Sequence, residues 1–169
     1  MAGPVVDILM YHSISGQGGP TAIAPDTFAA QMRAIAEAGV PVITLDDFCA
    51  AKIGGPALPD RSVIITFDDG FQDFADTAWP VMREHGFRPI VYLPAGLVGA
   101  LEHWPDCHHP PRRIMDWETI AKLAREGVAF GSHSVTHADL TTLDDAALEA
   151  ELIQSRSMIE ARLGHPIPH

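Results

Sequence analysis

The stretch ITFDDG, residues 65–70, ends an apolar segment with two adjacent carboxylates and a glycine. Neighbouring like charges repel each other, so Asp68 and Asp69 are costly partners unless a cation or a proton lies close by. An Asp-Asp-Gly tripeptide also occurs in ordinary turns, because aspartate and glycine both favour turn conformations. The pair therefore indicates either a turn or a cation site.

A second polar cluster is GSHSVTH, residues 131–137, in which His133 and His137 are four positions apart. On a helical turn, side chains at this spacing point in the same direction, so two imidazoles can bind one cation. Two histidines and one carboxylate give three protein ligands and leave the other positions for water, as in catalytic metal sites. One aspartate would neutralise the metal, and the other would accept a proton from metal-bound water. With nine histidines in the chain, the spacing could also arise by chance, and the histidines would then be satisfied core groups.

The elements that must position these motifs alternate between strands and helices. Strands are predicted at 5–11, 40–45, 62–67, 88–93 and 128–131, and helices at 26–38, 46–51, 74–85, 117–127 and 144–163. Such alternation implies a mainly parallel sheet covered by helices, and the loops after its strands should bring the two motifs together. Five strand–helix units are fewer than a closed (β/α) barrel needs, so we expect a partial α/β barrel. Its uncovered strand edge would favour a homo-oligomer.

Composition restricts the partners. The formal charge is −11, and the chain has only two lysines, which argues against a nucleic-acid or anionic-membrane partner because phosphate binding needs clustered basic side chains. No apolar stretch is long enough for a transmembrane segment. The N-terminal MAGPVVDILMYHS lacks the features of a signal peptide, so we expect a cytoplasmic protein as written, or an extracytoplasmic one if a leader was removed.

Taken together, ITFDDG and GSHSVTH resemble the first two motifs of the polysaccharide deacetylase family, also called the NodB homology domain or carbohydrate esterase family 4. The segments ILMYHSI and MDWETIAKLAREGVAFGSH are also similar to that family, particularly to members that act on poly-N-acetylglucosamine. The resemblance runs from about Ile8 to Gly164. It implies a distorted (β/α) barrel of the NodB type and a hydrolase of carbon–nitrogen bonds other than peptide bonds.

Carried over residue by residue, the resemblance makes Asp68 the catalytic base and Asp69, His133 and His137 the ligands of one divalent ion. Zinc is the expected ion, with cobalt or nickel as alternatives. Attack of metal-bound water, assisted by Asp68, would remove an N-acetyl or O-acetyl group from an acetylated sugar or glycan polymer. The chain stops at GHPIPH, where the family's third motif would begin. Residues 1–169 are therefore expected to form a single domain truncated before that motif, without the family's general acid.

Three further residues could contact the substrate or support the metal ligands. His12 follows the first predicted strand, Trp104 in the loop HWPDCHH could stack on a sugar ring, and Asp73 is more simply explained as the cap of the following helix. Two other functions stay open at this point. The same scaffold could hydrolyse a small non-polymeric amide such as a formamido or ureido compound, or the chain could be a non-catalytic fragment that binds metal or glycan.

Overall fold

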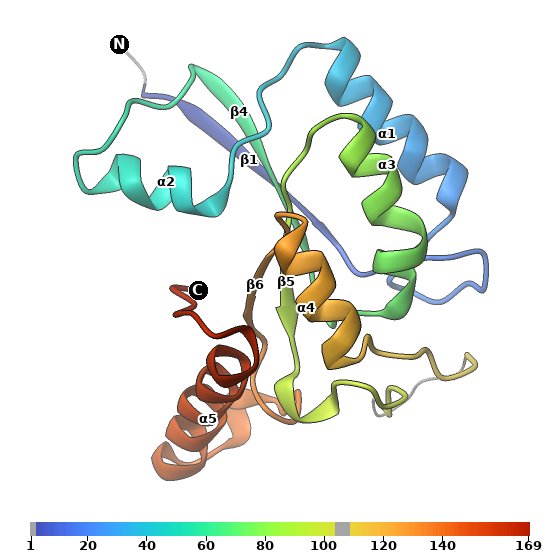
Figure 1. Cartoon of the computed structure of the whole chain (residues 1–169), viewed down its shortest axis with the longest axis vertical. Helices are drawn as coiled ribbons and strands as arrows, with labels where there is room; N and C mark the ends of the chain where they lie inside the picture. The colour runs from blue at the N-terminus through green and yellow to red at the C-terminus, as the bar shows by residue number, and fades with distance from the viewer. Residues whose placement is uncertain (1–2, 104–108) are drawn as a thin grey trace.

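The computed structural model describes residues 3–103 and 109–169 and shows a curved sheet of four parallel strands (Figure 1). The order across the sheet is β1–β4–β5–β6. The strands span Val5–Tyr11 (β1), Arg61–Phe67 (β4), Ile90–Leu93 (β5) and Ala129–Ser132 (β6). A short parallel pair, β2 (Ser13–Ile14) and β3 (Ala22–Ile23), lies in the loop that follows β1.

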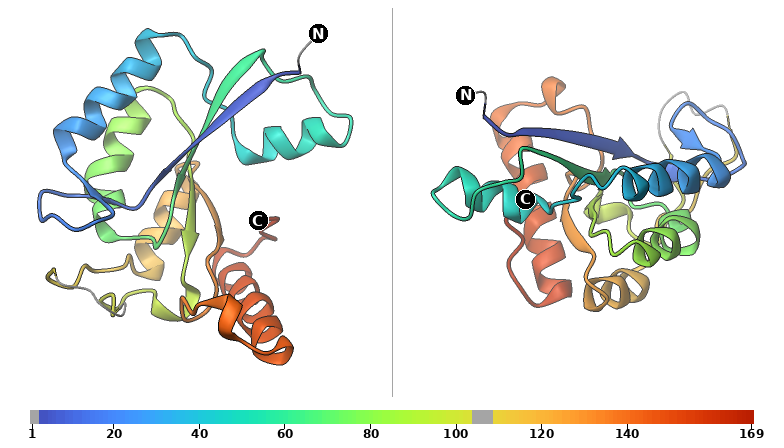
Figure 2. Two further views of the ribbon diagram at one scale, coloured as in Figure 1. Left: turned by 180° about the vertical axis from the view of Figure 1, so that it is seen from behind. Right: turned by 90° about the horizontal axis from the view of Figure 1, so that it is seen from above.

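The principal helices α1, α3, α4 and α5 follow one another around the outer side of the sheet, as the view from above shows (Figure 2). The α-helices span Pro25–Glu37 (α1), Leu45–Lys52 (α2), Trp79–Glu84 (α3), Trp117–Arg125 (α4) and Asp145–Leu163 (α5). Shorter helical turns are η1 (Phe74–Ala78), η2 (Ala95–Leu97) and η3 (Leu140–Thr142). This alternation of strands and helices confirms the predicted α/β class and gives a partial (β/α) barrel.

The strand predicted at 40–45 is wrong in its length. Only Val42 forms a bridge, to Val63 of β4, through the Pro41 carbonyl and the Ile43 N–H. Thr44 then caps α2: its hydroxyl accepts a hydrogen bond from the Asp47 N–H, and the Asp47 side chain accepts one from the Thr44 N–H. Helix α2 therefore begins directly after this single bridge. The second strand–helix unit has its predicted helix but almost no strand.

The segment after ITFDDG begins with a π-helical turn, η1, and continues as α3 from Trp79. Pro80 occupies the first turn of α3, as the sequence predicts. Proline has no N–H to donate to the carbonyl four residues earlier, which is consistent with the wider turn just before it.

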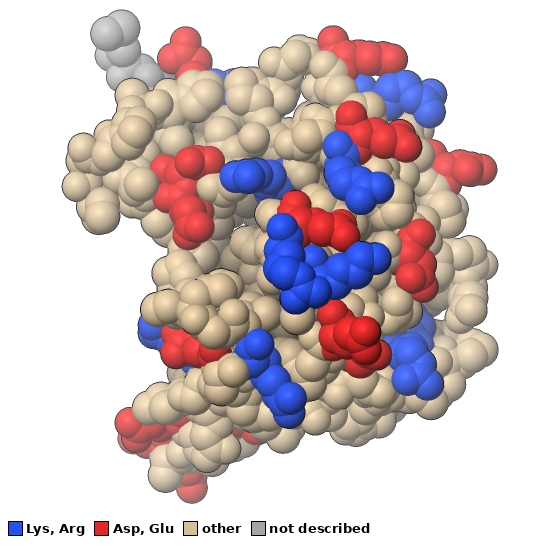
Figure 3. Space-filling model, in the orientation of Figure 1, with Lys and Arg blue, Asp and Glu red and all other residues tan. Residues whose placement is uncertain are grey.

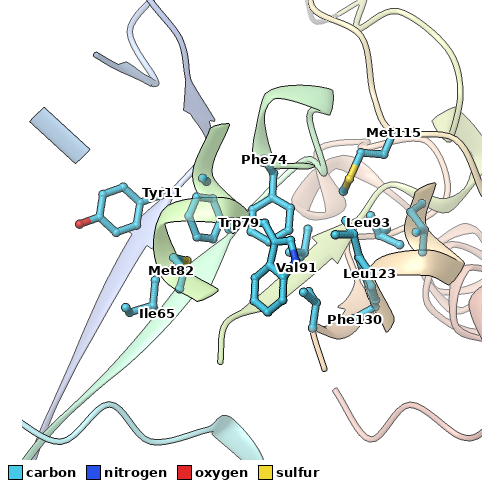
Figure 4. Close-up of a cluster of buried hydrophobic side chains, with 14 of the residues drawn as sticks. Tyr11, Ile65, Phe74, Trp79, Met82, Val91, Leu93, Met115, Leu123 and Phe130 are labelled. Atoms are coloured by element: carbon cyan, nitrogen blue, oxygen red, sulfur yellow. The ribbon is translucent and has the colours of Figure 1, made fainter. Parts of the chain in front are cut away.

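The main hydrophobic core lies between the sheet and its outer helices (Figure 4). Val91 and Leu93 alternate along β5 and are fully buried, because every second side chain of the strand points toward the helices. Phe67 of β4 meets Phe74 edge to face at 4.7 Å between ring centroids. This packing fixes the end of β4, where the loop with Asp68 and Asp69 begins, and the end of the neighbouring strand β5.

The other side of the sheet is less covered near β1. Ile8 and Met10 alternate along this strand and are 57% and 62% exposed. Within the described residues β1 pairs only with β4, so its other edge has no strand beside it. At the opposite edge of the sheet, which β6 forms, the carbonyl of His169 accepts a hydrogen bond from the Ser132 N–H at 3.1 Å.

Charged side chains are mixed on the molecular face that Figure 3 shows, where acidic groups lie between the basic ones. The formal charge of the whole chain is −11. No helix among the described residues is long and apolar enough to cross a membrane.

Candidate metal centre

The loop after β4 places Asp68 and Asp69 at the carboxyl end of the sheet. The Asp68 N–H donates to the Tyr11 carbonyl at 2.9 Å, which continues the pairing with β1 for one residue. Asp69 and Gly70 then adopt left-handed backbone angles, with φ of 68° and 63°. A Cβ on Gly70 would lie 2.5 Å from Leu93 Cδ2, so only glycine leaves room for this turn. The tight turn buries Asp69, which is 4% exposed.

The loop after β6 carries both histidines and is not helical. His133 continues the sheet by donating its N–H to the Leu93 carbonyl, at 2.9 Å. Ser134 and His137 have positive φ angles of 65° and 59°. The Ser134 hydroxyl accepts the His137 N–H at 3.0 Å and closes the loop. The reason given for the four-residue spacing, a helical turn, is therefore wrong, because left-handed backbone angles bring the two rings together.

Asp69 and the two histidines converge from the two loops. Asp69 Oδ1 lies 3.6 Å from His133 Nε2 and 3.2 Å from His137 Nε2. One donor atom from each of the three residues lies within 4.8 Å of the others. Asp69 Oδ1 is buried and accepts no aligned hydrogen bond from any described residue. A carboxylate oxygen facing two imidazole nitrogens is a donor set that suits a divalent cation such as zinc.

The environments of the titratable groups differ within this centre. Burial raises the pKa of Asp68 and lowers the pKa of His133, since both charged forms lose hydration. The Asp69 carboxylate raises the pKa of His137. Asp68 Oδ2 lies 3.9 Å from His12 Nε2, and Asp68 belongs to no described ligand cluster. The two adjacent aspartates therefore have different ion-pair partners within 4.0 Å among the described residues, although the charge of His133 also acts on Asp68.

The three additional candidates have different outcomes. His12 lies beside Asp68, as just described. Asp73 does not cap the helical segment after it; its carboxylate accepts hydrogen bonds from the Ser13 hydroxyl and, at 3.0 Å, from the Ile14 N–H. The capping interpretation is thus wrong, because the loop after β1 offers donors to the same carboxylate. Trp104 lies outside the described residues.

Two residues at this centre were not recognised in the sequence. Ser134 accepts the His137 N–H, and a serine inside an HxxxH segment is a local signal for such a turn. Glu151 of α5 accepts hydrogen bonds from Val135 and Thr136, between the two histidines. The contact joins residues sixteen positions apart, and no local pattern indicates it.

A partial (β/α) barrel with a carboxylate–imidazole cluster after its strands defines an α/β protein with a candidate site for one divalent cation. The sequence profile of the family described as Polysaccharide deacetylase matches residues 55–169, which include both motifs. The chain therefore belongs to the polysaccharide deacetylase family, as the resemblance of its motifs predicts.

Individual relatives agree with this assignment. YxkH of Bacillus subtilis, which is named as a polysaccharide deacetylase, is 25% identical over 153 residues, 90% of this chain and 50% of that protein. The poly-β-1,6-N-acetyl-D-glucosamine N-deacetylase of Escherichia coli K12 is 32% identical over 66 residues, 39% of this chain and 10% of that protein. The solved structure of the deacetylase PplD from Streptococcus pyogenes matches with a TM-score of 0.81 and 21% identity, covering 97% of this chain and 72% of that one.

The chain spans only part of the length of these relatives. The chain spans half the length of YxkH and a tenth of the Escherichia coli deacetylase. The likeness to PplD concerns the fold and confirms the expected barrel type.

Proposed function

We propose that residues 1–169 form one domain of a metal-dependent carbohydrate deacetylase that hydrolyses N-acetyl groups, or alternatively O-acetyl groups, of a sugar or glycan polymer. The observation that supports this most directly is the buried Oδ1 of Asp69, which faces His133 Nε2 and His137 Nε2 without an aligned hydrogen bond from the described residues. A buried carboxylate oxygen is costly unless positive charge lies beside it, and a divalent cation between this oxygen and the two imidazole nitrogens would supply that charge.

The proposed ligands are Asp69, His133 and His137, and the proposed ion is zinc, with cobalt or nickel as alternatives. When bound, a divalent ion polarises the acyl carbonyl and lowers the pKa of a coordinated water. Burial lowers the pKa of His133, which keeps its imidazole neutral and able to coordinate.

Asp68 is the proposed general base, which would accept the proton of the attacking water. Burial raises the pKa of this carboxyl above its ordinary value of 3.8, and a higher pKa makes its carboxylate a stronger base. His12 Nε2, 3.9 Å from Asp68 Oδ2, is close enough to influence the charge and orientation of the base. Asp73 would hold the segment that follows His12 through Ser13 and Ile14.

Family membership supports the proposed substrate class. The relatives named above include a polysaccharide deacetylase and a poly-N-acetylglucosamine N-deacetylase, which supports an acetylated glycan. A small formamido or ureido compound is the alternative substrate on the same scaffold, and a fragment that binds metal or glycan without turnover is the alternative function.

The first test is metal content, measured by elemental analysis of the untagged protein after incubation with zinc. Wild type should hold about one ion, as expected for a three-ligand mononuclear site, and Asp69→Ala and His133→Ala should hold none. His165→Ala is the matched control, since this histidine lies in the C-terminal segment and its Nδ1 contacts the Pro166 carbonyl. A metal-free wild type would exclude the metal mechanism.

The second test is acetate release from an N-acetylglucosamine oligosaccharide. Asp68→Asn should keep the ion and lose about 10²–10⁴-fold in rate, the usual contribution of a general base. A wild type that holds the ion and binds the oligosaccharide without releasing acetate would instead favour the non-catalytic alternative. Release of product only from small amides would favour the alternative substrate.

A further inference from the structure

Helix α5 contacts the histidine loop through one carboxylate. Glu151 accepts three hydrogen bonds: from the Val135 N–H at 2.6 Å, from the Thr136 N–H at 2.9 Å and from the Thr136 hydroxyl at 2.7 Å. Both backbone donors lie between His133 and His137. Hydrogen bonds to a charged acceptor are the stronger class, so this contact is a substantial restraint on the loop.

The carbonyl groups of the same loop have different partners. The Ser134 carbonyl accepts the Ala95 N–H at 3.0 Å, and the Val135 carbonyl accepts the Gly96 N–H at 2.9 Å. A Cβ on Gly96 would lie 2.8 Å from the Val135 oxygen, which shows how closely η2 approaches the loop. The loop is thus held through its carbonyls by η2 and through its N–H groups by Glu151.

The helix holds the residue before His133 as well. Ser155, one turn beyond Glu151, is fully buried and forms a hydrogen bond with the Ser132 hydroxyl. Ile159, a further turn along, is also fully buried in the core. Because these side chains repeat every four residues, one face of α5 holds the chain on both sides of His133.

A loop of this shape needs such restraints. Ser134 and His137 both occupy the left-handed backbone region, which is unfavourable for residues with a Cβ. Without an acceptor for its N–H groups, the loop could relax toward ordinary backbone angles and turn the His137 ring away from Asp69. The restraint and the strain are on the same four-residue segment.

We propose that Glu151 is a positioning residue that holds the loop at 133–137 so that both imidazoles face Asp69, and thereby sets the metal affinity of the site. The inference rests on the proposed function, because it assumes that Asp69, His133 and His137 bind a divalent ion. Residues that orient metal ligands typically change metal affinity by about 10- to 100-fold when they are replaced.

The test compares Glu151→Ala and Glu151→Gln with a control on the same helix, Glu160→Ala. Glu160 accepts a backbone hydrogen bond from Ile167 and another from Arg156, so its loss also removes a carboxylate contact, but one at the C-terminal segment. Alanine is a strong helix former, so neither alanine variant should disrupt α5 itself. Glutamine keeps one acceptor oxygen, so Glu151→Gln should retain part of the wild-type restraint on the loop.

Two readouts are measured: the dissociation constant for Co²⁺ from its visible absorption, and hydrogen exchange of the Val135 and Thr136 amides in the metal-free protein. Glu151→Ala should bind Co²⁺ about 10- to 100-fold more weakly, with altered absorption bands, and should lose protection of these two amides. Glu151→Gln should fall between Glu151→Ala and wild type, and Glu160→Ala should match wild type in both readouts.

The outcomes separate the two proposals. If Glu151→Ala binds Co²⁺ as tightly as wild type, the positioning role is overturned, and the proposed metal site is unaffected. If wild type binds no Co²⁺, the proposed function fails, whereas faster exchange of the two amides in Glu151→Ala alone would still support the restraint. Unchanged exchange in Glu151→Ala would overturn the restraint whatever the metal result.

Discussion

Individual residues carry the unfavourable backbone conformations of this molecule. Among the described residues, positive φ angles outside glycine occur only at Asp69, Ser134 and His137. All three belong to the two loops of the candidate metal centre. Strained backbone persists only where the surrounding structure enforces it, and such strain concentrates at functional sites. Its confinement to these loops is an indication of function independent of any resemblance to known proteins.

Gly131, two residues before His133, has a packing role that can be tested. A Cβ at this position would lie 2.7 Å from both Cδ1 and Cε1 of the Tyr92 ring and 3.2 Å from the His169 oxygen. We expect Gly131→Ala to lower the free energy of unfolding by about 1–3 kcal/mol, the usual cost of overpacking. Urea denaturation measures this change.

The matched control is Gly16→Ala, since a Cβ on Gly16 meets nothing within 4 Å. Its effect should stay within about 0.5 kcal/mol. Equal stability of Gly131→Ala and wild type would show that the Tyr92 ring can move aside without cost.

At the scale of elements, a buried ion pair closes the loop between β5 and α4. Arg112 Nε and Nη2 donate to the two carboxylate oxygens of Glu102 at 2.7 and 2.8 Å, and both residues are buried. The guanidinium also lies 3.9 Å from the centroid of the Phe71 ring and donates to the Thr21 hydroxyl at 3.2 Å. The pair thus connects this loop to the segment after Asp69 and to the loop after β1.

Removing one partner should be costly. Arg112→Leu removes the guanidinium and leaves the buried Glu102 carboxylate with the backbone N–H of residue 112 and with His109 at 3.6 Å, and we expect a loss of about 3–5 kcal/mol in the free energy of unfolding. Thermal or urea denaturation checks this value. Arg61→Leu is the control, because its pair with Asp7 is exposed and should contribute only about 0–1 kcal/mol. A similar small loss for both variants would contradict the structural role of the buried pair.

The hydrogen bonds between α5 and the histidine loop should also depend on pH. Burial opposes the charge of Glu151, but hydrogen bonds from Thr136 and Val135 outweigh it and lower its pKa below the ordinary value of 4.5. A lowered pKa in the folded state adds stability above pH 4.5, and this contribution is lost as the pH falls through the folded-state pKa. The stability difference between wild type and Glu151→Gln should therefore shrink from pH 6 to pH 3, in urea unfolding followed by circular dichroism. A constant difference would exclude titration of Glu151 as its source.

For the molecule as a whole, metal binding should increase the free energy of unfolding. A ligand that binds only the folded state adds about 2.7 kcal/mol at a hundred times its dissociation constant. Zinc should therefore raise the melting temperature of wild type, and a chelator should reverse the increase. His133→Ala should show neither change. A zinc effect of equal size in this variant would place the binding elsewhere on the surface.

The oligomeric state of the chain stays a prediction. The edge of β1 has no neighbouring strand within the described residues, and Ile8 and Met10 are exposed beside it. We expect concentration-dependent association in sedimentation velocity, weakened by Ile8→Lys and Met10→Lys because charged side chains oppose edge pairing. Ile53→Lys is the control, since this residue is 88% exposed at the end of α2. Association that is insensitive to the β1 variants would locate the contact on another face.

Much of the fold was predictable because its signals are local. The apolar runs of β1 and β4, the Asp116 cap of α4 and the Gly164 end of α5 all depend on neighbours within a few residues. The length of the strand at 40–45 was mispredicted, because it depends on how many residues of this segment pair with β4, and only Val42 does so.

The sequence by itself determined the residue types of the candidate metal centre and their order after the strands. The resemblance of its motifs to a known family then singled out Asp69, with His133 and His137, as the proposed ligands without a structure. Only the tertiary structure decided how they meet, through left-handed turns at Asp69, Ser134 and His137 and not through a helical turn. It also decided that Asp73 holds the loop after β1 and that Glu151 holds the histidine loop. These contacts join segments that are distant in sequence, and side-chain partners at such separations are selected by the packing of whole elements rather than by local preference.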